Sequence, residues 1–527
     1  MEPTDIEPRP ATRRPGPPRP GTVVRAVAVG LCTAAVTLGV SHLGAAVVDP
    51  AADPVLAVGA ASIDLAPQPL KAFAIRTFGT NDKIVLLGGV YTVLVLAAVA
   101  LGAAALRRRR FGLVGLVAFT GVGAVAVLSR PTATAVDVLP VLAGAGAGVV
   151  AMLLVVRAAR TVTSAATGRP RLLNRRQFLA TAGGTAVGAA AVTTAGQAIA
   201  RSRPVGAESR ASVSLPPPVR PAPPLPATVS VGVDGMPPFV TPNRDFYRVD
   251  TALIVPQVDL TDWRLTLDGA VDRPRTWRYE DLLARGLVER DITLNCVSNE
   301  VGGPYIGTAR WTGIPLAPLL REAGLRPGQN QLVSRSVEGM TIGTPLEAIL
   351  DGRDALLAVG MNGEPLPLDH GFPLRMLVPG LYGYVGACKW LTSMTVTTFD
   401  AFDPYWVQRG WAPDAPVKTA SRIDTPKPFA QRPAGPVMIA GVAWAQRRGI
   451  TAVEVQVDDG PWQQARLADG PSPDLWRQWT YRWDATPGSH TLRVRATDAT
   501  GATQTAQRVP PFPDGATGWH SVTVTIT

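Results

Sequence analysis

Cysteine, histidine and charged residues are scarce in this chain of 527 residues. It contains three cysteines and four histidines, and charged residues make up 17% of it. Three cysteines cannot build the disulfide framework of a small secreted protein. The low charge and a mean hydropathy of +0.15 indicate membrane-inserted segments combined with a soluble part. The length is also too great for one ordinary domain.

The excess of basic residues, a net charge of +11, does not form one continuous basic patch. Arginines gather in runs beside apolar segments, as in residues 107–110 and 169–176. Such runs are typical of membrane-topology signals. The sequence also shows no P-loop, zinc-ligand cluster or internal repeat. We therefore expect no nucleic-acid partner.

Four apolar stretches in residues 23–160 are long enough to cross a bilayer as helices. The preceding segment, residues 1–22, is rich in proline and arginine and is predicted to be a disordered cytoplasmic tail. Glycine and alanine in the last two stretches suit close helix packing. The four predicted spans are residues 23–48, 84–106, 111–128 and 136–156.

Arginine clusters predict the orientation of these spans. One cluster precedes the first span, a second joins the second and third spans, and a third follows the fourth span. Loops rich in Lys and Arg stay in the cytoplasm, and all three clusters fall on that side if the N-terminus is cytoplasmic. The sequence thus predicts a multi-pass protein of the cell membrane, in contact with lipid, whose later part lies on the extracytoplasmic side.

Residues 170–200 resemble a twin-arginine export signal placed inside the chain. Arg175-Arg176 is followed by Gln-Phe-Leu and then by a weakly hydrophobic run rich in Ala, Gly and Thr. The twin-arginine route exports folded proteins, so it suits a domain that receives a buried cofactor before export. The alternative is an ordinary fifth span, and the same helix can serve as both signal and anchor.

The composition changes three times after residue 200. Residues 201–235 are rich in proline and are predicted to be a semi-rigid polyproline linker. Residues 236–400 mix short strand and helix patterns, which favours an α+β domain. Residues 401–527 show alternating strands separated by turn signals, as expected for an immunoglobulin-like β-sandwich. The predicted fold is multi-domain: transmembrane helices, an α+β domain and a β-sandwich.

Cys296 stands where a short apolar strand enters a loop rich in polar residues and glycine. Such a position holds a side chain on a rigid scaffold and leaves it reachable. Arg310, nearby in sequence, is a candidate to favour a thiolate or an anionic ligand. Three alternatives stay open at this point. Cys296 is a small core residue, or it pairs with Cys388 in a disulfide, or Arg310 belongs to a surface ion pair.

Four motifs, in the same order, resemble the sulfite oxidase family of molybdenum enzymes across residues 236–527. The first is Asn-Arg-Asp-Phe-Tyr-Arg at residues 243–248, and the second is Cys296 with Gly-Thr-Ala-Arg-Trp at 307–311. The third is Gly-Glu-Pro-Leu-Pro-Leu-Asp-His-Gly-Phe-Pro-Leu-Arg at 363–375. The fourth contains Pro379-Gly380 and Cys-Lys-Trp-Leu at 388–391. A single motif of this kind would be weak evidence, whereas four in order are specific.

The resemblance implies a molybdenum–molybdopterin cofactor and two-electron oxygen-atom transfer on a small oxyanion or a sulfur or nitrogen oxide. It makes Cys296 a catalytic thiolate ligand of the metal, with Arg310 as a second catalytic residue. It also implies a homodimer formed through the β-sandwich. The sequence shows no haem-binding domain, so electrons would pass to a separate cytochrome or quinone-linked carrier. The residues implied to bind the cofactor are Asn243, Tyr247, Arg248, Cys296, His370, Arg375 and Lys389.

One departure from the family pattern bears on the substrate. Sulfite oxidases carry arginines directly after the Cys-x-x-Asn segment, whereas Glu300 and Val301 follow Asn299 in this chain. A carboxylate near the pocket repels a dianion such as sulfite. Reduction of a sulfoxide or a similar oxide is therefore an alternative within the family. A non-catalytic surface protein that uses the β-sandwich for interaction is an alternative of another class.

Overall fold

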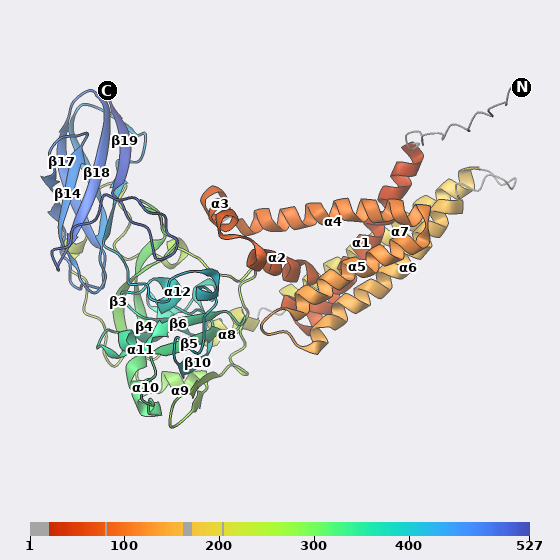
Figure 1. The fold of residues 1–527 in the computed structure, drawn as a ribbon, viewed down its shortest axis with the longest axis horizontal. Helices are drawn as coiled ribbons and strands as arrows, with labels where there is room; N and C mark the ends of the chain where they lie inside the picture. The colour runs from red at the N-terminus through yellow and green to blue at the C-terminus, as the bar shows by residue number, and fades with distance from the viewer. Residues whose placement is uncertain (1–19, 79–81, 162–170, 203–204) are drawn as a thin grey trace, which may run out of the picture. The chain divides into compact units, whose positions relative to one another are not determined.

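The computed structural model describes residues 20–78, 82–161, 171–202 and 205–527 (Figure 1). The chain separates into two compact units, Met1–Arg203 and Pro204–Thr527. Residues 1–19 of the predicted cytoplasmic tail lie outside the described residues, and residues 20–22 already belong to the first helix.

The regular secondary structure of the first unit is all helical over its described residues. Five of its helices are long and apolar enough to cross a membrane, which agrees with the four predicted spans and the predicted helix at 170–200. Three shorter helices, η1, α2 and α3, occupy the segment between α1 and α4. The helices are α1 (Pro20–Val48), η1 (Pro50–Ala52), α2 (Pro54–Leu65), α3 (Gln68–Phe78), α4 (Asp82–Arg107), α5 (Arg109–Leu128), η3 (Ala135–Val138), α6 (Leu139–Thr161) and α7 (Arg171–Arg201).

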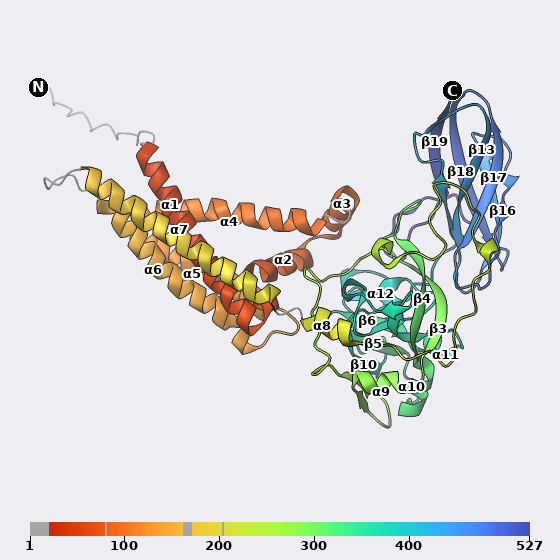
Figure 2. The same ribbon diagram turned by 180° about the vertical axis from the view of Figure 1, so that it is seen from behind.

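Helix α1 is the centre of this unit and packs against α4, α6 and α7 (Figure 2). Its crossing with α4 is close because two glycines face the opposite backbone. A Cβ atom on Gly30 would overlap the carbonyl group of Ala98, and one on Gly102 would overlap that of Ala26. Small residues at such crossings let two helix backbones touch, which is how helices associate where no hydrophobic effect drives them together.

The helix with the twin-arginine-like sequence, α7, lies along α1. Gly196 of α7 lies against the ring of His42, and Gly39 of α1 lies against Thr193. Phe178, in the motif itself, is buried in a cluster with Cys32 of α1. The segment therefore forms one continuous helix, Arg171–Arg201, that packs on α1.

The second unit begins with an α+β part built on two sheets. Its helices are short and amphipathic, as in α10, where Leu316, Leu319, Leu320 and Ala323 are buried and Gly324 ends the helix in a left-handed conformation. The first sheet has the order β2 (Arg275–Trp277), β1 (Leu265–Gly269), β10 (Leu391–Thr397), β5 (Gln331–Ser336) and β6 (Thr341–Pro345). The second has the order β3 (Val288–Asn295), β4 (Ile306–Pro315), β7 (Leu356–Met361) and β8 (Glu364–Pro365), and β9 (Arg375–Leu377) also pairs with β7. The helices are α9 (Tyr279–Leu283), α10 (Leu316–Ala323), α11 (Leu346–Leu350) and α12 (Gly383–Gly386).

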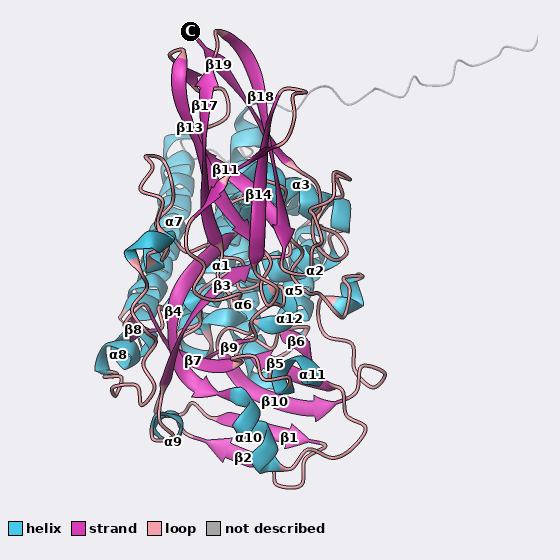
Figure 3. Ribbon diagram, turned by 90° about the vertical axis from the view of Figure 1, so that its left-hand side faces the viewer, coloured by secondary structure: helices cyan, strands magenta, loops and turns pink. Residues whose placement is uncertain are grey.

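The C-terminal part is a pair of β-sheets (Figure 3). Alternate residues of its strands turn inward, as do Leu492, Val494 and Ala496 of β18, so two half-apolar sheets bury a common core. The immunoglobulin-like assignment of this part stays a prediction. One sheet has the order β11 (Ala420–Thr425), β13 (Gly435–Trp444), β17 (Arg477–Ala485) and β16 (Arg466–Leu467). The other has the order β12 (Gln431–Arg432), β19 (His520–Ile526), β18 (Gly488–Asp498), β14 (Ile450–Val457) and β15 (Gln463–Gln464).

The proline-rich segment predicted to be a linker is not a free spacer over its described residues. It contains a helix, α8 (Val205–Ser212), and the Arg210 side chain donates to the carbonyl oxygens of Leu366 and Pro365. The backbone of Arg220 pairs with the edge strand β3 in a parallel bridge. An extended proline-rich chain covers that exposed edge, which explains why it packs instead of spanning open space.

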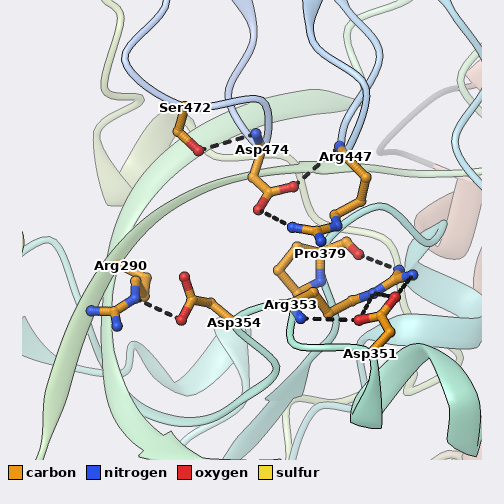
Figure 4. Close-up of polar contacts among 8 residues, drawn as sticks. All are labelled: Arg290, Asp351, Arg353, Asp354, Pro379, Arg447, Ser472 and Asp474. Atoms are coloured by element: carbon orange, nitrogen blue, oxygen red, sulfur yellow. Dashed lines mark hydrogen bonds and ion pairs between the residues drawn. The ribbon is translucent and has the colours of Figure 1, made fainter. Parts of the chain in front are cut away.

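The two parts of the second unit meet through buried polar contacts. Thr293 of β3 donates its N–H to the carbonyl of Asp474 at 3.0 Å, and its hydroxyl accepts from the N–H of Trp476 at 2.8 Å. The Asp474 carboxylate in turn binds the backbone and the guanidinium of Arg447 (Figure 4). Strand β3, which leads into Cys296, is therefore bonded directly to the C-terminal part.

Candidate cofactor site

Cys296 directly follows β3, where the chain enters the loop that leads to β4. Its N–H donates to the carbonyl of Tyr305 at 3.0 Å, and its carbonyl accepts from the N–H of Asn299 at 3.1 Å. The side chain is buried and carries a free thiol, as does Cys388. The disulfide that the sequence left open is therefore absent, and the thiol stays available as a ligand.

The surroundings of the Cys296 sulfur act on its ionisation in opposite directions. Burial raises the pKa of the thiol, while hydrogen bonds from the backbone and side chain of Ser298 and the positive charge of Lys389 lower it. Ser298 was not identified from the sequence, although a serine two residues after a ligand is well placed to donate to it. A bound metal ion would replace the thiol proton outright.

His370 and Arg375 lie on either side of the turn that leads into β9. The Nε2 atom of His370 is 2.9 Å from the carbonyl oxygen of Asn243, which assigns the ring proton to Nε2. Arg375 Nη1 donates to the carbonyl of His370 at 3.3 Å, and its guanidinium carbon lies 5.3 Å from the centre of the Trp311 ring. Burial is the main cause that lowers the pKa of both His370 and Arg375.

A buried carboxylate links two of the predicted cofactor-binding cations. Asp250 Oδ2 lies 2.8 Å from Arg248 Nε and 2.6 Å from Lys389 Nζ. Burial lowers the pKa of Lys389 to about 8, against the attraction of Asp250. Asp250 was missed from the sequence. Its spacing from Arg248 could have identified it, since the side chains of residues i and i+2 in an extended chain point to the same side.

Asn243 is held by a residue that the sequence motifs did not single out. The side-chain amide nitrogen of Asn362 donates to the side-chain oxygen of Asn243 at 2.8 Å. The side-chain oxygen of Asn362 accepts from the backbone N–H of Arg310 at 2.9 Å. Asn362 has a φ of 52°, which is rare for residues other than glycine but tolerated by asparagine. The Asn362-Gly363 pair is a strong hairpin-turn signal, so this position was identifiable as a turn.

Four of the predicted residues converge. Tyr247 is partly buried, and its phenol interacts electrostatically with Cys296 and Arg375, although burial is the main cause that raises its pKa. Lys389 in turn interacts with Cys296 and with Arg375. These residues come from segments up to about 140 positions apart in the chain, and the fold brings them to one buried place.

Arg310 binds Asp291 and Pro223 instead of the converging residues. Its Nε and Nη2 atoms donate to the two carboxylate oxygens of Asp291 at 2.9 and 2.8 Å, and Nη2 also donates to the carbonyl of Pro223 at 2.8 Å. This is the ion pair that the sequence left open as the alternative for Arg310. The catalytic role of Arg310 stays a prediction, and the geometry gives it a structural partner.

The converging residues fit an anionic group with a soft metal. Three cationic side chains meet here, those of Arg248, Arg375 and Lys389. The Asp250 carboxylate contacts two of them, Arg248 and Lys389. Arg375 is buried, and its Nε has no hydrogen-bond partner among the described residues. A buried excess of positive charge is costly without an anion such as a phosphate. A nearby thiol supplies the soft ligand that molybdenum takes.

The loop after Cys296 also borders a pocket shared with the β-sheet pair. Asn299, Glu300 and Gly302 line it from the loop, and no lysine or arginine is among its lining residues. Gly302 has a φ of +81°, and a Cβ there would overlap the ring of His520. Glycine at this position therefore lets the β-sheet pair approach the loop.

Comparison with known proteins agrees with this site. A family model described as "Oxidoreductase molybdopterin binding domain" matches residues 252–406, close to the predicted domain at 236–400. A mitochondrial sulfite oxidase of Drosophila melanogaster is 30% identical over 295 residues, which cover 46% of this chain and 50% of the relative. The chain thus spans about half the length of the sulfite oxidases that it matches.

Two further matches cover different shares of the chain. The solved structure of the sulfane dehydrogenase SoxCD from Paracoccus pantotrophus has a TM-score of 0.49 and 23% identity, and the match covers 55% of this chain and 82% of that one. An uncharacterized oxidoreductase of Bacillus subtilis, YuiH, is 30% identical over 176 residues, which cover 33% of this chain and 85% of the relative. Because that relative is matched over most of its length, this chain belongs to the sulfite oxidase family of molybdopterin-binding oxidoreductases, whose cofactor is molybdenum–molybdopterin.

Proposed function

We propose that this chain is a membrane-anchored enzyme that catalyses two-electron oxygen-atom transfer on a small substrate outside the cytoplasmic membrane. The observation that carries the proposal is the buried convergence of Cys296, Tyr247, Arg375 and Lys389. A free thiol beside the buried guanidinium of Arg375, whose Nε has no hydrogen-bond partner among the described residues, has little structural value by itself, because a buried charge without a partner costs stability.

Each residue of the convergence has a role in holding the cofactor. Cys296 is the thiolate ligand of the metal, and Ser298 keeps its sulfur oriented. Arg375 and Lys389 bind the anionic end of the pterin, for which a guanidinium offers a planar pair of donors. His370 is held by its hydrogen bond to the Asn243 carbonyl and would contact the pterin, as the family motif implies. The bound cofactor supplies the two-electron chemistry.

Asn243, Tyr247 and Arg248 complete the cofactor contacts in this proposal. Tyr247 keeps its proton, because burial raises the pKa of its phenol, so it offers a hydrogen-bond donor beside Cys296 and Arg375. Arg248 binds the Asp250 carboxylate, which also binds Lys389. These three assignments come from the family motif at residues 243–248 and are supported by its position against His370 and Lys389.

The helical unit supports the proposed location of the enzyme. The arginine clusters favour a cytoplasmic N-terminus, and Arg175-Arg176 opens a helix suited to twin-arginine export. The catalytic part then lies on the extracytoplasmic side and exchanges electrons with a separate cytochrome or quinone-linked carrier. We further propose that the β-sheet pair is immunoglobulin-like and forms a homodimer, as in the family.

A second candidate is the reduction of a neutral sulfoxide or similar oxide. The pocket next to the Cys296 loop favours it, because Glu300 lines this pocket and no lysine or arginine does. A sulfite dianion meets one carboxylate there and no compensating cation. A neutral oxide meets no such repulsion.

The test is a substrate panel on the purified full chain in detergent. Sulfite is offered with an artificial electron acceptor, and neutral sulfoxides and N-oxides are offered with an artificial electron donor. The proposal expects turnover in at least one direction and expects it to depend on molybdenum content. A chain that contains stoichiometric molybdenum and turns over nothing in either direction would support the non-catalytic alternative.

A further inference from the structure

Helix α8 (Val205–Ser212) lies beside strand β8 of the second unit (Figure 3). Arg210, in the last turn of this helix, binds three consecutive residues with one guanidinium. Its Nε donates to the carbonyl of Leu366 at 2.9 Å, and its Nη2 donates to the carbonyl of Pro365 at 2.8 Å. Nη2 also lies 2.8 Å from the Glu364 carboxylate. The helix is thereby bound to the start of the third sequence motif.

The Glu364 carboxylate extends this contact into the proposed cofactor site. Its Oε2 binds Arg210, and its Oε1 accepts a hydrogen bond from the side-chain amide of Asn243. The carbonyl of Asn243 is in turn the partner of His370 Nε2 at 2.9 Å. The hydrogen bonds from Asn243 and Arg210 lower the pKa of Glu364, which therefore stays charged at neutral pH. Arg210 is thus linked through one carboxylate to the residue that holds His370.

Helix α8 is also seated directly on a segment of the proposed cofactor site. It contacts η6 (Leu368–His370). Gly206 is buried, and a Cβ atom there would press against the backbone of Gln257. The hydroxyl oxygen of Ser209 accepts from the N–H of Leu260 at 3.3 Å. The helix is therefore held at its start and its middle as well as through its arginine.

Charge alone does not explain the role of this arginine. Arg210 is partly exposed and Glu364 is exposed, and ion pairs of this kind contribute little to the free energy of unfolding. A guanidinium that also binds two backbone carbonyls orders the segment that carries them, because its donors form a fixed fork. Local opening of a short segment breaks few other contacts, so such a clamp changes local opening more than global stability.

We propose that α8 is a clasp on the cofactor site and that Arg210 is a positioning residue, which acts through Glu364 and Asn243 to slow release of the bound cofactor. The segment between the twin-arginine-like helix and the catalytic part then belongs to the site and is more than a connection. This inference rests on the proposed cofactor contacts of Asn243 and His370. It adds to them a residue that lies outside the four sequence motifs.

The rate of cofactor release tests the proposal without any measurement of turnover. The full chain, loaded with its cofactor in detergent, is freed of unbound pterin and held below the thermal midpoint of every variant. The pterin that appears in the protein-free filtrate is followed by fluorescence after oxidation. Arg210→Ala should release it about five- to tenfold faster than wild type, since the loss of hydrogen bonds from a charged donor favours local opening.

Arg285→Ala is the matched control. The Arg285–Glu322 ion pair has the same N–O distance, 2.8 Å, with side chains 30% and 51% exposed. The corresponding exposed fractions for Arg210 and Glu364 are 28% and 50%. Both substitutions should lower the thermal midpoint by similar small amounts, but Arg285→Ala should leave the release rate unchanged. Hydrogen exchange at residues 361–366 should likewise accelerate in Arg210→Ala only.

A double-mutant cycle tests whether Arg210 acts through Glu364. Glu364→Ala should also speed release, and Arg210→Ala added to it should speed release by less than it does in wild type, because the shared contact is already lost. Equal release from wild type and Arg210→Ala, equal acceleration in Arg285→Ala, or fully independent effects in the cycle would overturn the inference. A loaded chain that turns over no substrate, yet releases its cofactor faster in Arg210→Ala, supports the clasp and contradicts the proposed catalytic function alone.

Discussion

The guanidinium of Arg422 donates a hydrogen bond to the carbonyl oxygen of Gly303, with Nη1 and the oxygen 2.7 Å apart. Arg422 belongs to β11 of the β-sheet pair, and Gly303 belongs to the loop that follows Cys296. Arg422 also binds Asp424 at 3.0 Å, and both residues are buried. The C-terminal part thus holds the loop that forms one wall of the pocket.

Arg422→Ala should destabilise the second unit by about 3 kcal/mol or more, because it leaves the Asp424 carboxylate buried without its cation. Burial already raises the pKa of Asp424 against the pull of Arg422. Asp424→Asn should cost less, since Arg422 keeps its bond to Gly303. Thermal unfolding of the full-length variants measures the difference. Hydrogen exchange at residues 300–303 should accelerate in Arg422→Ala only, and equal exchange in both variants would contradict this role for Arg422.

His520 makes stability depend on pH. Burial, with Arg422 and Arg508 nearby, lowers the pKa of His520 to about 4 from 6.5, and its Nδ1 accepts from the N–H of Ile423 at 3.0 Å. Between pH 4 and 6.5 the unfolded chain binds the proton and the folded chain does not. Stability is therefore full above pH 6.5 and falls as the pH drops toward 4, by at most about 3 kcal/mol.

The variant His520→Asn checks this sign, because an asparagine oxygen can accept from Ile423 without titrating. The thermal midpoint of wild type should fall more steeply between pH 6.5 and 4 than that of His520→Asn. Parallel curves for the two proteins would show that His520 does not carry this dependence.

Glu300 should weaken the binding of anionic substrates. A carboxylate roughly 5 Å from a unit negative charge costs about 3 kcal/mol at an effective dielectric of ~20, an upper value that salt and exposure reduce. Glu300→Arg should therefore lower the KM for sulfite about tenfold or more at low salt and change the KM for a neutral sulfoxide little. If wild type already handles micromolar sulfite and the variant leaves its KM unchanged, Glu300 does not act on the substrate.

The orientation of the chain is tested separately from its chemistry. With a cytoplasmic N-terminus, an alkaline phosphatase fusion after residue 230 should be active, and a fusion within residues 107–110 should be inactive. Replacement of Arg175-Arg176 by two lysines should leave the first four spans inserted and keep the second unit inside. Active phosphatase within residues 107–110 together with inactive phosphatase after residue 230 would reverse the assigned topology.

Much of this architecture was predictable from sequence because its signals are local. Long apolar runs predicted the helices that are long enough to cross a membrane, and the alternation of apolar and polar residues predicted strands such as β14 and β18. The motifs that contain Cys296, His370, Arg375 and Lys389 predicted a cofactor site, since those residues belong to short blocks whose order along the chain is itself informative. The proline-rich segment was harder. Its contacts with β3 and with the carbonyl of Leu366 join positions far apart in sequence, and composition alone indicates only an extended chain.

The partners of the site residues were the least predictable part. Asp250, Ser298 and Asn362 orient Lys389, Cys296 and Asn243, but each is an ordinary polar residue in its local sequence. Arg310 shows the reverse case. Its place in a family motif made it a catalytic candidate, whereas Asp291 on the neighbouring strand engages it in the fold. Cross-strand pairing depends on register, which the sequence around Arg310 did not specify.

The most direct test of the central claim is molybdenum X-ray absorption of the purified full chain, with wild type and Cys296→Ser compared at matched metal loading. Ser298→Ala serves as the control, because it alters the hydrogen bond to the sulfur and leaves the ligand in place. We expect about one molybdenum per chain in wild type. Cys296→Ser should lose one sulfur ligand of the metal and all turnover, whereas Ser298→Ala should keep the full number of sulfur ligands. An unchanged sulfur count and full turnover in Cys296→Ser would contradict the assignment of Cys296 as the metal ligand.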